Sequence, residues 1–165
     1  MRKLLWLITV AGATCLWSAG AAAQTKIAWS DSCGKADPDY TVQVGDPANH
    51  ILGMGQVKCH ATKPAEIGGV KLKEALVSFA TVTSGDKSRE HGIYVLTLES
   101  GDKVSLAYQA TIPIKDNKPT AFPATWNFGD GTGKLKGIKG KGTVHCTPAG
   151  EGWNCNVEGE YELAK

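Results

Sequence analysis

Residues 103–112 read Lys-Val-Ser-Leu-Ala-Tyr-Gln-Ala-Thr-Ile, and this stretch decides the class of fold. Every second residue from Val104 to Ile112 is apolar, and most of the residues between them are polar. A period of two is what a β-strand with one buried face requires. The stretches 122–128 and 157–163 repeat the pattern, so the sequence predicts an all-β domain.

Turn-like sequences at 84–87, 99–102 and 115–119 separate the strand-like stretches at the spacing of β-hairpins. They predict an antiparallel meander with an irregular excursion at residues 31–48. We place its strands near residues 26–30, 50–59, 73–84, 89–99, 103–113, 121–128, 139–147 and 153–163.

Eight strands of this kind can hide their apolar faces by folding over as a sandwich or by closing into a barrel. We favour a closed eight-stranded antiparallel barrel of the calycin type, because closure removes both edges of the sheet. The 20 glycines help such a sheet to curve. Residues 74–83 and 92–99 carry apolar residues on both faces, which indicates either cover on both sides or a subunit contact in a homo-oligomer.

The first 23 residues have the three parts of a cleavable signal peptide: basic Arg2 and Lys3, an uncharged apolar run over 4–17, and small residues over 19–23. We therefore expect an exported protein, periplasmic or secreted, whose single mature domain spans 24–165. A lipoprotein anchor at Cys15 is the alternative, although the residues before it fit a lipobox poorly.

Arg2 and Lys3 account for the whole net charge of +2, so the mature chain is formally neutral. Proteins that bind nucleic acid or membrane surfaces generally need a strong basic excess. We therefore expect no nucleic-acid partner. No long apolar segment follows residue 23, so we also expect no membrane insertion.

Four cysteines remain after cleavage: Cys33, Cys59, Cys146 and Cys155. An even number in a small exported domain predicts two disulfides, and three pairings are available. We favour Cys146–Cys155, because residues 147–152 look like a hairpin loop, and this leaves Cys33–Cys59. Zinc binding is the competing interpretation, but no CxxC spacing is present, so we expect no metal.

Residues 131–140 read Gly-Thr-Gly-Lys-Leu-Lys-Gly-Ile-Lys-Gly. This segment resembles the glycine-rich turn of the allene oxide cyclase and dirigent-like barrels, here in an exported protein of bacterial type. The resemblance implies an eight-stranded barrel. It also implies that a cyclase, isomerase or coupling-guide activity on a hydrophobic substrate is available without a cofactor.

The same segment matches neither the GxxxxGK[ST] nor the GxGxxG phosphate-binding pattern. Its glycines instead suit positive φ angles and close approach of strands. The local lysines form either a solvated face or an anion site; they are Lys134, Lys136, Lys139 and Lys141.

Three polar residues at strand ends are candidates for acid–base chemistry: Glu74, Arg89 and His91. A carboxylate at Glu74, drawn into an apolar barrel, would have a raised pKa. Arg89 and His91 lie two apart, so they point the same way and could bind a carboxylate at the barrel mouth. Ordinary solvated strand ends are the alternative for all three.

Aromatic residues on the apolar stripes are candidates for lining a ligand cavity, with core packing as the alternative. These residues are Tyr94, Tyr108, Trp126, Phe128 and Tyr161. The leading hypothesis is a non-catalytic barrel that binds a small hydrophobic or amphipathic molecule, without a cofactor. The cofactor-free enzyme implied by the resemblance is the second, and a structural or interaction protein with a packed barrel is the third.

The first testable prediction concerns the cysteines. Non-reducing peptide mapping of the mature protein should find Cys33 joined to Cys59 and Cys146 joined to Cys155, with no free thiol. The second bridge closes a short hairpin, so loop entropy gives it a contribution to stability of about 2–3 kcal/mol. A crossed pairing such as Cys33 with Cys155 would contradict the order of strands at both ends of the meander.

Overall fold

The computed structural model describes residues 24–63 and 65–164, so the predicted signal peptide and Cys15 lie outside the described residues. β-strands make up most of this part of the chain. The long strands are β1 (Thr25–Cys33), β3 (Ile51–Lys63), β5 (Val70–Ser84), β6 (Lys87–Leu98), β7 (Lys103–Lys115), β9 (Phe122–Gly131), β10 (Lys139–Ala149) and β11 (Gly152–Glu162). The shorter elements are β2 (Asp39–Gln43), β4 (Glu66–Ile67), β8 (Lys118–Pro119) and the 3₁₀ helix η1 (Gly133–Leu135).

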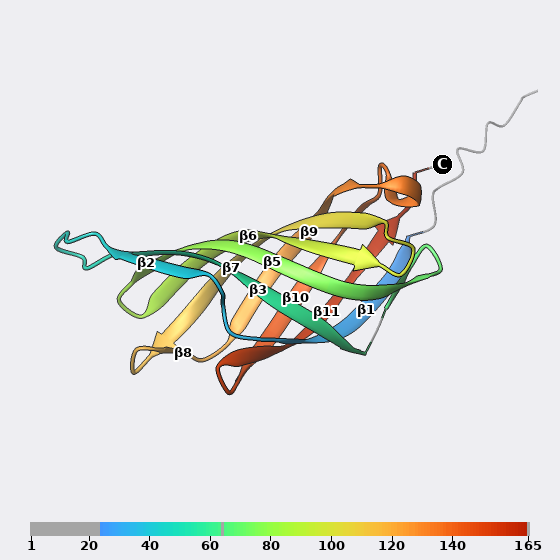
Figure 1. The fold of residues 1–165 in the computed structure, drawn as a ribbon. Coiled ribbons are helices and arrows are strands. Elements are labelled where there is room, and N and C mark those ends of the chain that lie inside the picture. Colours follow the sequence, from blue (N-terminus) through green and yellow to red (C-terminus); the bar gives the residue numbers. More distant parts are fainter. Residues whose placement is uncertain (1–23, 64, 165) are drawn as a thin grey trace, which may run out of the picture.

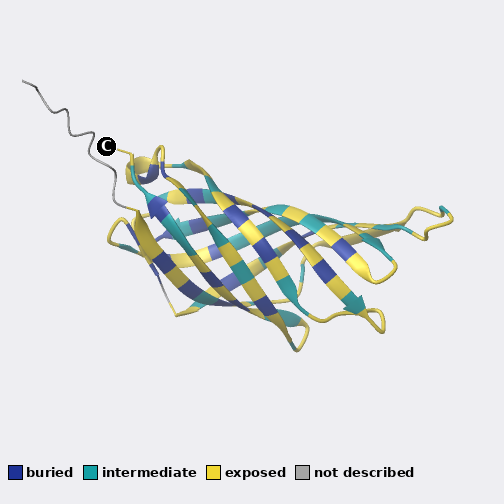
Figure 2. Cartoon of the chain, turned by 180° about the vertical axis from the view of Figure 1, so that it is seen from behind, coloured by how far each residue is buried: buried dark blue, intermediate teal, exposed yellow. Residues whose placement is uncertain are grey.

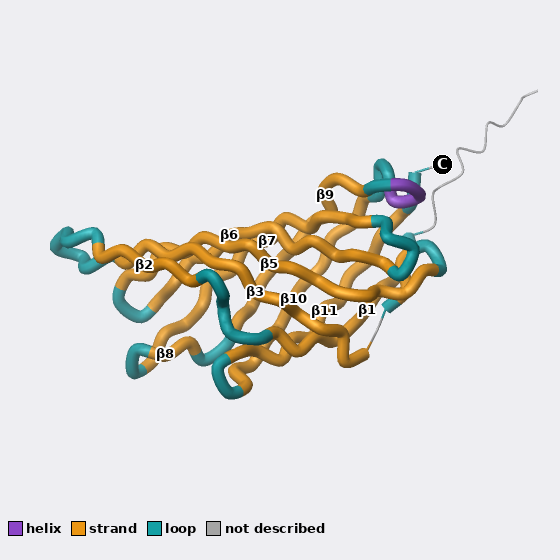
Figure 3. The backbone as a smooth tube through the Cα atoms, in the orientation of Figure 1, coloured by secondary structure: helices purple, strands orange, loops and turns teal. Residues whose placement is uncertain are grey.

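The long strands form a closed antiparallel barrel of eight strands, as the sequence predicts. Each long strand pairs with the next one along the chain, and β11 pairs with β1 to close the sheet, with Trp29 opposite Val157. Figure 1 shows the strands wound around a common interior. Figure 3 shows that the loops lie mainly at the two ends of the barrel.

The predicted irregular excursion contains a strand that the sequence analysis missed. β2 pairs antiparallel with the first part of β3, with Tyr40 opposite Met54, and extends the sheet beyond the barrel. Residues 31–33, also assigned to the excursion, belong to β1. The alternation of Tyr40, Thr41 and Val42 suits an extended strand, but the segment is too short to be distinguished from a loop by pattern alone.

Buried and exposed residues alternate along the strands, as Figure 2 shows. One end of the interior, where η1 and the two described chain ends lie, is filled by side chains. Leu135 of η1 and Ile138 are both buried there. A row of aromatic rings continues from this packed end toward the middle of the barrel: Trp126 lies 5.0 Å from Phe128, and Phe128 lies 6.4 Å from Tyr161, between ring centroids.

The indole of Trp126 fits against β10 and β11 because two inward-facing residues there are glycines. A Cβ at Gly142 would lie 2.5 Å from Cζ2 of Trp126, and a Cβ at Gly159 would overlap the same ring. The glycines therefore let the indole approach the backbone closely and reach Trp29 of β1, whose ring centroid is 6.2 Å away.

The glycine-rich segment 131–140 joins β9 to β10 through η1. Gly133 and Gly137 have φ angles of 53° and 71°, which confirms that two of the four glycines in this segment supply positive φ. The side chains of Lys134 and Lys136 are exposed, while Leu135 between them packs into the barrel end. The segment is therefore a plug for the packed end as well as a turn.

The outer faces of β5 and β6 are not covered by other parts of the described chain. Val82 and Ile93, on these faces, are 40% and 45% exposed. The apolar residues on the outer faces of these strands are therefore not explained by packing against another part of the same chain. A contact in a homo-oligomer stays a prediction.

The second prediction tests the role of the plug. Gly133→Val and Gly137→Val should each lower the free energy of unfolding by about 1–3 kcal/mol, because a β-branched residue is strained at positive φ. At Gly133 a side chain would also overlap the carboxylate of Asp102. Lys134→Gln and Lys136→Gln are the matched controls, and exposed charges of this kind change stability by less than about 1 kcal/mol. Urea unfolding of the four variants measures the ranking, and the reverse ranking would contradict the plug role.

Candidate functional site

The end of the barrel opposite the plug contains a cavity of about 610 Å³. The inward-facing residues of the barrel strands form its wall, and the turn after β10 and the segment after β1 contribute to its mouth. We call this space the barrel cavity. Its volume lies within the range of about 300–1,000 Å³ that is usual for small-molecule sites.

Three of the five aromatic residues predicted to line a ligand site line the barrel cavity: Tyr94, Tyr108 and Trp126. The other two, Phe128 and Tyr161, belong to the aromatic row of the packed end and do not line it. The cavity wall also includes four aromatic residues that were not singled out from the sequence: Trp29, Phe79, Phe122 and Trp153.

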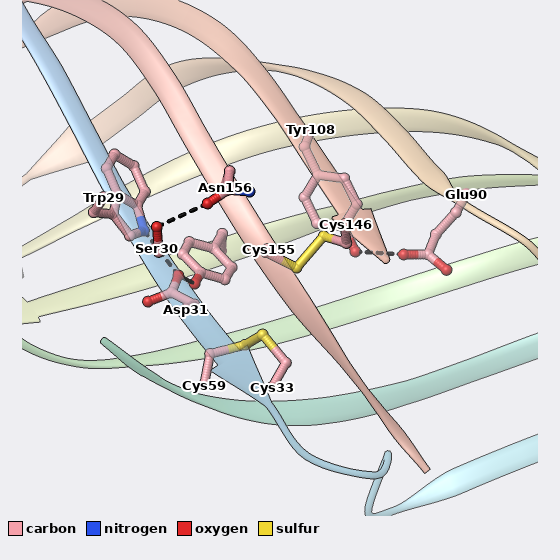
Figure 4. The surroundings of a disulfide bond; sticks show 11 residues. Trp29, Ser30, Asp31, Cys33, Cys59, Glu90, Tyr108, Cys146, Cys155 and Asn156 are labelled. Carbon is pink, nitrogen blue, oxygen red and sulfur yellow. Dashed lines mark hydrogen bonds between the residues drawn. A yellow bond between two sulfur atoms is a disulfide. The ribbon is translucent and has the colours of Figure 1, made fainter. Parts of the chain in front are cut away.

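A carboxyl group and a phenol form a hydrogen-bonded pair in the cavity wall. The Tyr108 hydroxyl donates to Oε1 of Glu90 over 2.7 Å (Figure 4). Gly92 makes this contact possible, because it lies directly opposite Tyr108 in the β6–β7 register and a Cβ there would lie 2.8 Å from the Tyr108 hydroxyl. The ring therefore lies across β6 where a larger residue would block it.

Burial changes the acidity of both members of this pair. The pKa of Glu90 is raised from 4.5 to about 7 by loss of solvation, which the hydrogen bond from Tyr108 only partly opposes. The pKa of Tyr108 is raised, first by burial and then by the neighbouring carboxyl group. Glu90 therefore gains and loses its proton near neutral pH, which sequence position alone did not indicate.

A second carboxyl group, Asp31, lies in the barrel interior and is 2% exposed, but it does not line the cavity. Trp29 Nε1 donates a hydrogen bond of 2.8 Å to its Oδ2, and the Tyr94 hydroxyl donates to the same atom. In the sheet, β3 and β5 separate β1 from β6, so the Tyr94–Asp31 bond joins strands that do not pair with each other. This bond crosses the barrel interior.

Oδ1 of Asp31 is buried and has no hydrogen-bond partner among the described residues. Loss of solvation raises the pKa of Asp31, while the bonds from Tyr94 and Trp29 and the charge of His60 lower it. Burial also raises the pKa of Tyr94. The bonded oxygen is thus satisfied by two donors, whereas the second oxygen favours the protonated form of the acid.

Both disulfides form part of the cavity wall, and their pairing is the one favoured from the sequence. Cys33 and Cys59 lie directly opposite each other on β1 and β3, and Cys146 and Cys155 do so on β10 and β11. Figure 4 places the two bridges near the Asp31 and Glu90 hydrogen bonds. Each bridge fixes the register of one strand pair at the cavity.

The three residues predicted as catalytic candidates have exposed side chains, and none of them lines the cavity: Glu74, Arg89 and His91. Glu74 is not drawn into the barrel, and its exposed side chain fits the alternative of a solvated strand end. A register shift between Leu72 and Glu74 interrupts the alternation of β5, so that Glu74 follows Lys73 on the exposed side. Arg89 and His91 do point the same way, but outward.

Asp31 and Glu90 were not predicted from the sequence as site residues. The signal for Glu90 was available: if Arg89 and His91 share one face, the residue between them faces the other side. For Asp31, the signal is its spacing of two from Trp29, which places both side chains on one face of β1. Among the residues that the structure describes, no cluster of three His, Cys, Asp or Glu side chains could hold a metal ion.

The third prediction follows from the burial of Glu90. Its pKa is higher in the folded protein than in the unfolded chain, so wild type should lose stability as pH rises from about 4.5 to about 7, by up to about 3 kcal/mol. Glu90→Gln removes this loss and should therefore gain relative to wild type as pH rises. Urea unfolding from pH 4 to pH 8 measures the difference.

The matched control is Glu74→Gln, which removes an exposed carboxyl group and should follow the wild-type pH dependence. Asp31 is present in all three proteins and contributes equally to each. Parallel stability–pH profiles for wild type and Glu90→Gln would contradict the prediction that burial raises the pKa of Glu90 in the folded protein.

No known family model matches this chain, and no curated protein matches it. Among solved structures, the chain is similar to the crystal structure of a protein of unknown function from the DUF3224 family of Shewanella oneidensis MR-1. The two have 12% sequence identity and a TM-score of 0.53, over 87% of this chain and 99% of that one. At this level of identity the likeness concerns the fold alone: both chains form the same kind of barrel.

Proposed function

We propose that this protein binds a small apolar or amphipathic molecule inside its barrel and does not catalyse a reaction on it. The observation that carries the proposal is the barrel cavity of about 610 Å³. A fully packed barrel of eight strands is filled by its own side chains. Here the interior is filled at one end and left open to a ligand at the other.

The wall of the cavity suits an apolar ligand. Aliphatic side chains form much of it, including Val57, Val77, Leu106 and Val144. Removing apolar surface from water stabilises a complex by about 25 cal/mol per Å², so contact with this wall is the main source of affinity. The carboxyl–phenol pair of Glu90 and Tyr108 supplies a polar anchor that can orient the ligand.

The cellular setting of the proposal is the exported compartment. The two disulfides suggest an oxidising environment outside the cytoplasm. No helix among the described residues is long and apolar enough to cross a membrane. Together with the signal peptide predicted for residues 1–23, these features support a binding protein of the periplasm or the medium.

A cofactor-free isomerase or cyclase is the second candidate, and Glu90 is the observation that favours it. A carboxyl group with a pKa of about 7 in an apolar cavity is suited to general acid–base catalysis. The resemblance of residues 131–140 to the allene oxide cyclase and dirigent-like barrels supports the same candidate. Fold and a short turn do not fix an activity, so we rank this second.

The fourth prediction tests binding. Nile red, a neutral apolar dye, should bind the mature protein at a single saturable site with an increase in fluorescence. Val77→Trp places a large side chain in the cavity and should abolish or strongly reduce binding. Val82→Trp, on the outer face of the same strand, is the matched control and should leave binding unchanged.

Near-UV circular dichroism of both variants verifies that they are folded. Absence of saturable binding to folded wild type would contradict the proposal and favour an interaction protein. Equal loss of binding in both variants, with folding intact, would place the dye outside the cavity and contradict the proposal as well.

A further inference from the structure

The charged groups that line the barrel cavity are distributed unevenly between its mouth and its inner wall. Four of its lining residues carry charged groups: Lys35, Asp39, Glu90 and Glu151. The amine of Lys35 is at the exposed mouth, where its Nζ lies 3.6 Å from Oε1 of Glu151. Only Glu90 lies within the barrel wall, and among the described lining residues no cation accompanies it there.

Glu90 has an unused acceptor. Tyr108 donates to Oε1, and no described residue donates a hydrogen bond to Oε2. The nearest cation in the sequence, Arg89, faces outward on the other side of β6. An ionised carboxyl group in apolar surroundings is costly unless a cation or hydrogen-bond donors accompany it. The site therefore favours a ligand that brings a positive charge and a donor to Glu90.

The aromatic lining of the cavity also favours a positively charged ligand. Seven aromatic side chains contribute to the wall: Trp29, Phe79, Tyr94, Tyr108, Phe122, Trp126 and Trp153. The faces of such rings attract cations, most strongly where water is excluded. An anionic amphiphile such as a fatty acid would instead meet the carboxyl group of Glu90 without a basic partner.

We propose that the ligand of the barrel cavity is an organic cation, an aromatic or aliphatic body with a protonated amine, and that its ammonium group pairs with Glu90. This inference rests on the proposed binding function and adds the chemical class of the ligand. It also assigns Glu90 as the residue that selects for it, with the aromatic rings holding the apolar body.

The experiment compares three probes that share one ring system and differ in the polar group: 1-naphthylmethylamine, 1-naphthylmethanol and 1-naphthoate. Titration calorimetry of the mature, disulfide-bonded protein at pH 8 gives the three affinities while Glu90 is ionised. We expect the amine to bind about tenfold more tightly than the alcohol, and the carboxylate to bind more weakly than the alcohol.

Glu90→Gln should reduce the affinity for the amine to that for the alcohol and leave the alcohol within about twofold, because only a charge–charge interaction is removed. Glu74→Gln is the control for total charge and should bind all three probes as wild type does. If E90Q lost binding of the alcohol as well, the wild-type ranking of the three probes would still decide the proposal.

Equal affinities in wild type, or tightest binding of 1-naphthoate, would overturn the cation proposal while the binding function stands. Preference for the amine that Glu90→Gln leaves intact would also overturn it, because the charge would then be recognised elsewhere. Absence of binding for all three probes would remove both the cation proposal and the binding function.

Discussion

The pairing of β11 with β1 is the interaction on which the rest of the structure depends. It closes the sheet and turns the inner faces of the strands away from bulk water. β1 supplies Trp29, Asp31 and Cys33 to the interior, and each makes a contact with a side chain on another element. An open sheet would leave these groups at a solvated edge, and the hydrogen bond that crosses the interior from Tyr94 would have no fixed partner.

Once the barrel is closed, the size of its interior is limited by the number of strands, and the distribution of side-chain volume decides where space remains. At the packed end, the aromatic row together with Leu135 and Ile138 fills the interior, and inward-facing glycines such as Gly142 let the indole of Trp126 approach the wall closely. Toward the other end, smaller side chains such as Val57, Val77 and Val144 face inward. The cavity therefore results from uneven packing along one continuous barrel.

Features that depend on local pattern could be predicted from the sequence. The order of the long strands follows from period-two alternation and hairpin spacing, and Cys146–Cys155 follows from the hairpin between its cysteines. Features that depend on exceptions to the pattern could not be predicted. The register shift at Leu72 moved Glu74 to the outside, and Asp31 and Glu90 are polar residues on an apolar face. A polar residue normally indicates the solvent side, and only the closed structure shows that these two face inward.

The two interior carboxyl groups differ in how completely they are bonded, and this separates their roles. Asp31 is almost fully buried, receives two hydrogen bonds on one oxygen, and links β1 to β6 across the barrel. Asp31 does not line the cavity, and its bonded oxygen is already held by Trp29 and Tyr94. Glu90 receives a single bond, from Tyr108, and lines the cavity. Desolvation raises the pKa of both, but only Glu90 can exchange its proton for a charged partner without disturbing the packing of the barrel. The cost of desolvating a carboxyl group therefore has different consequences at the two residues. At Asp31 it is offset by hydrogen bonds within the barrel, whereas at Glu90 a ligand is able to offset it.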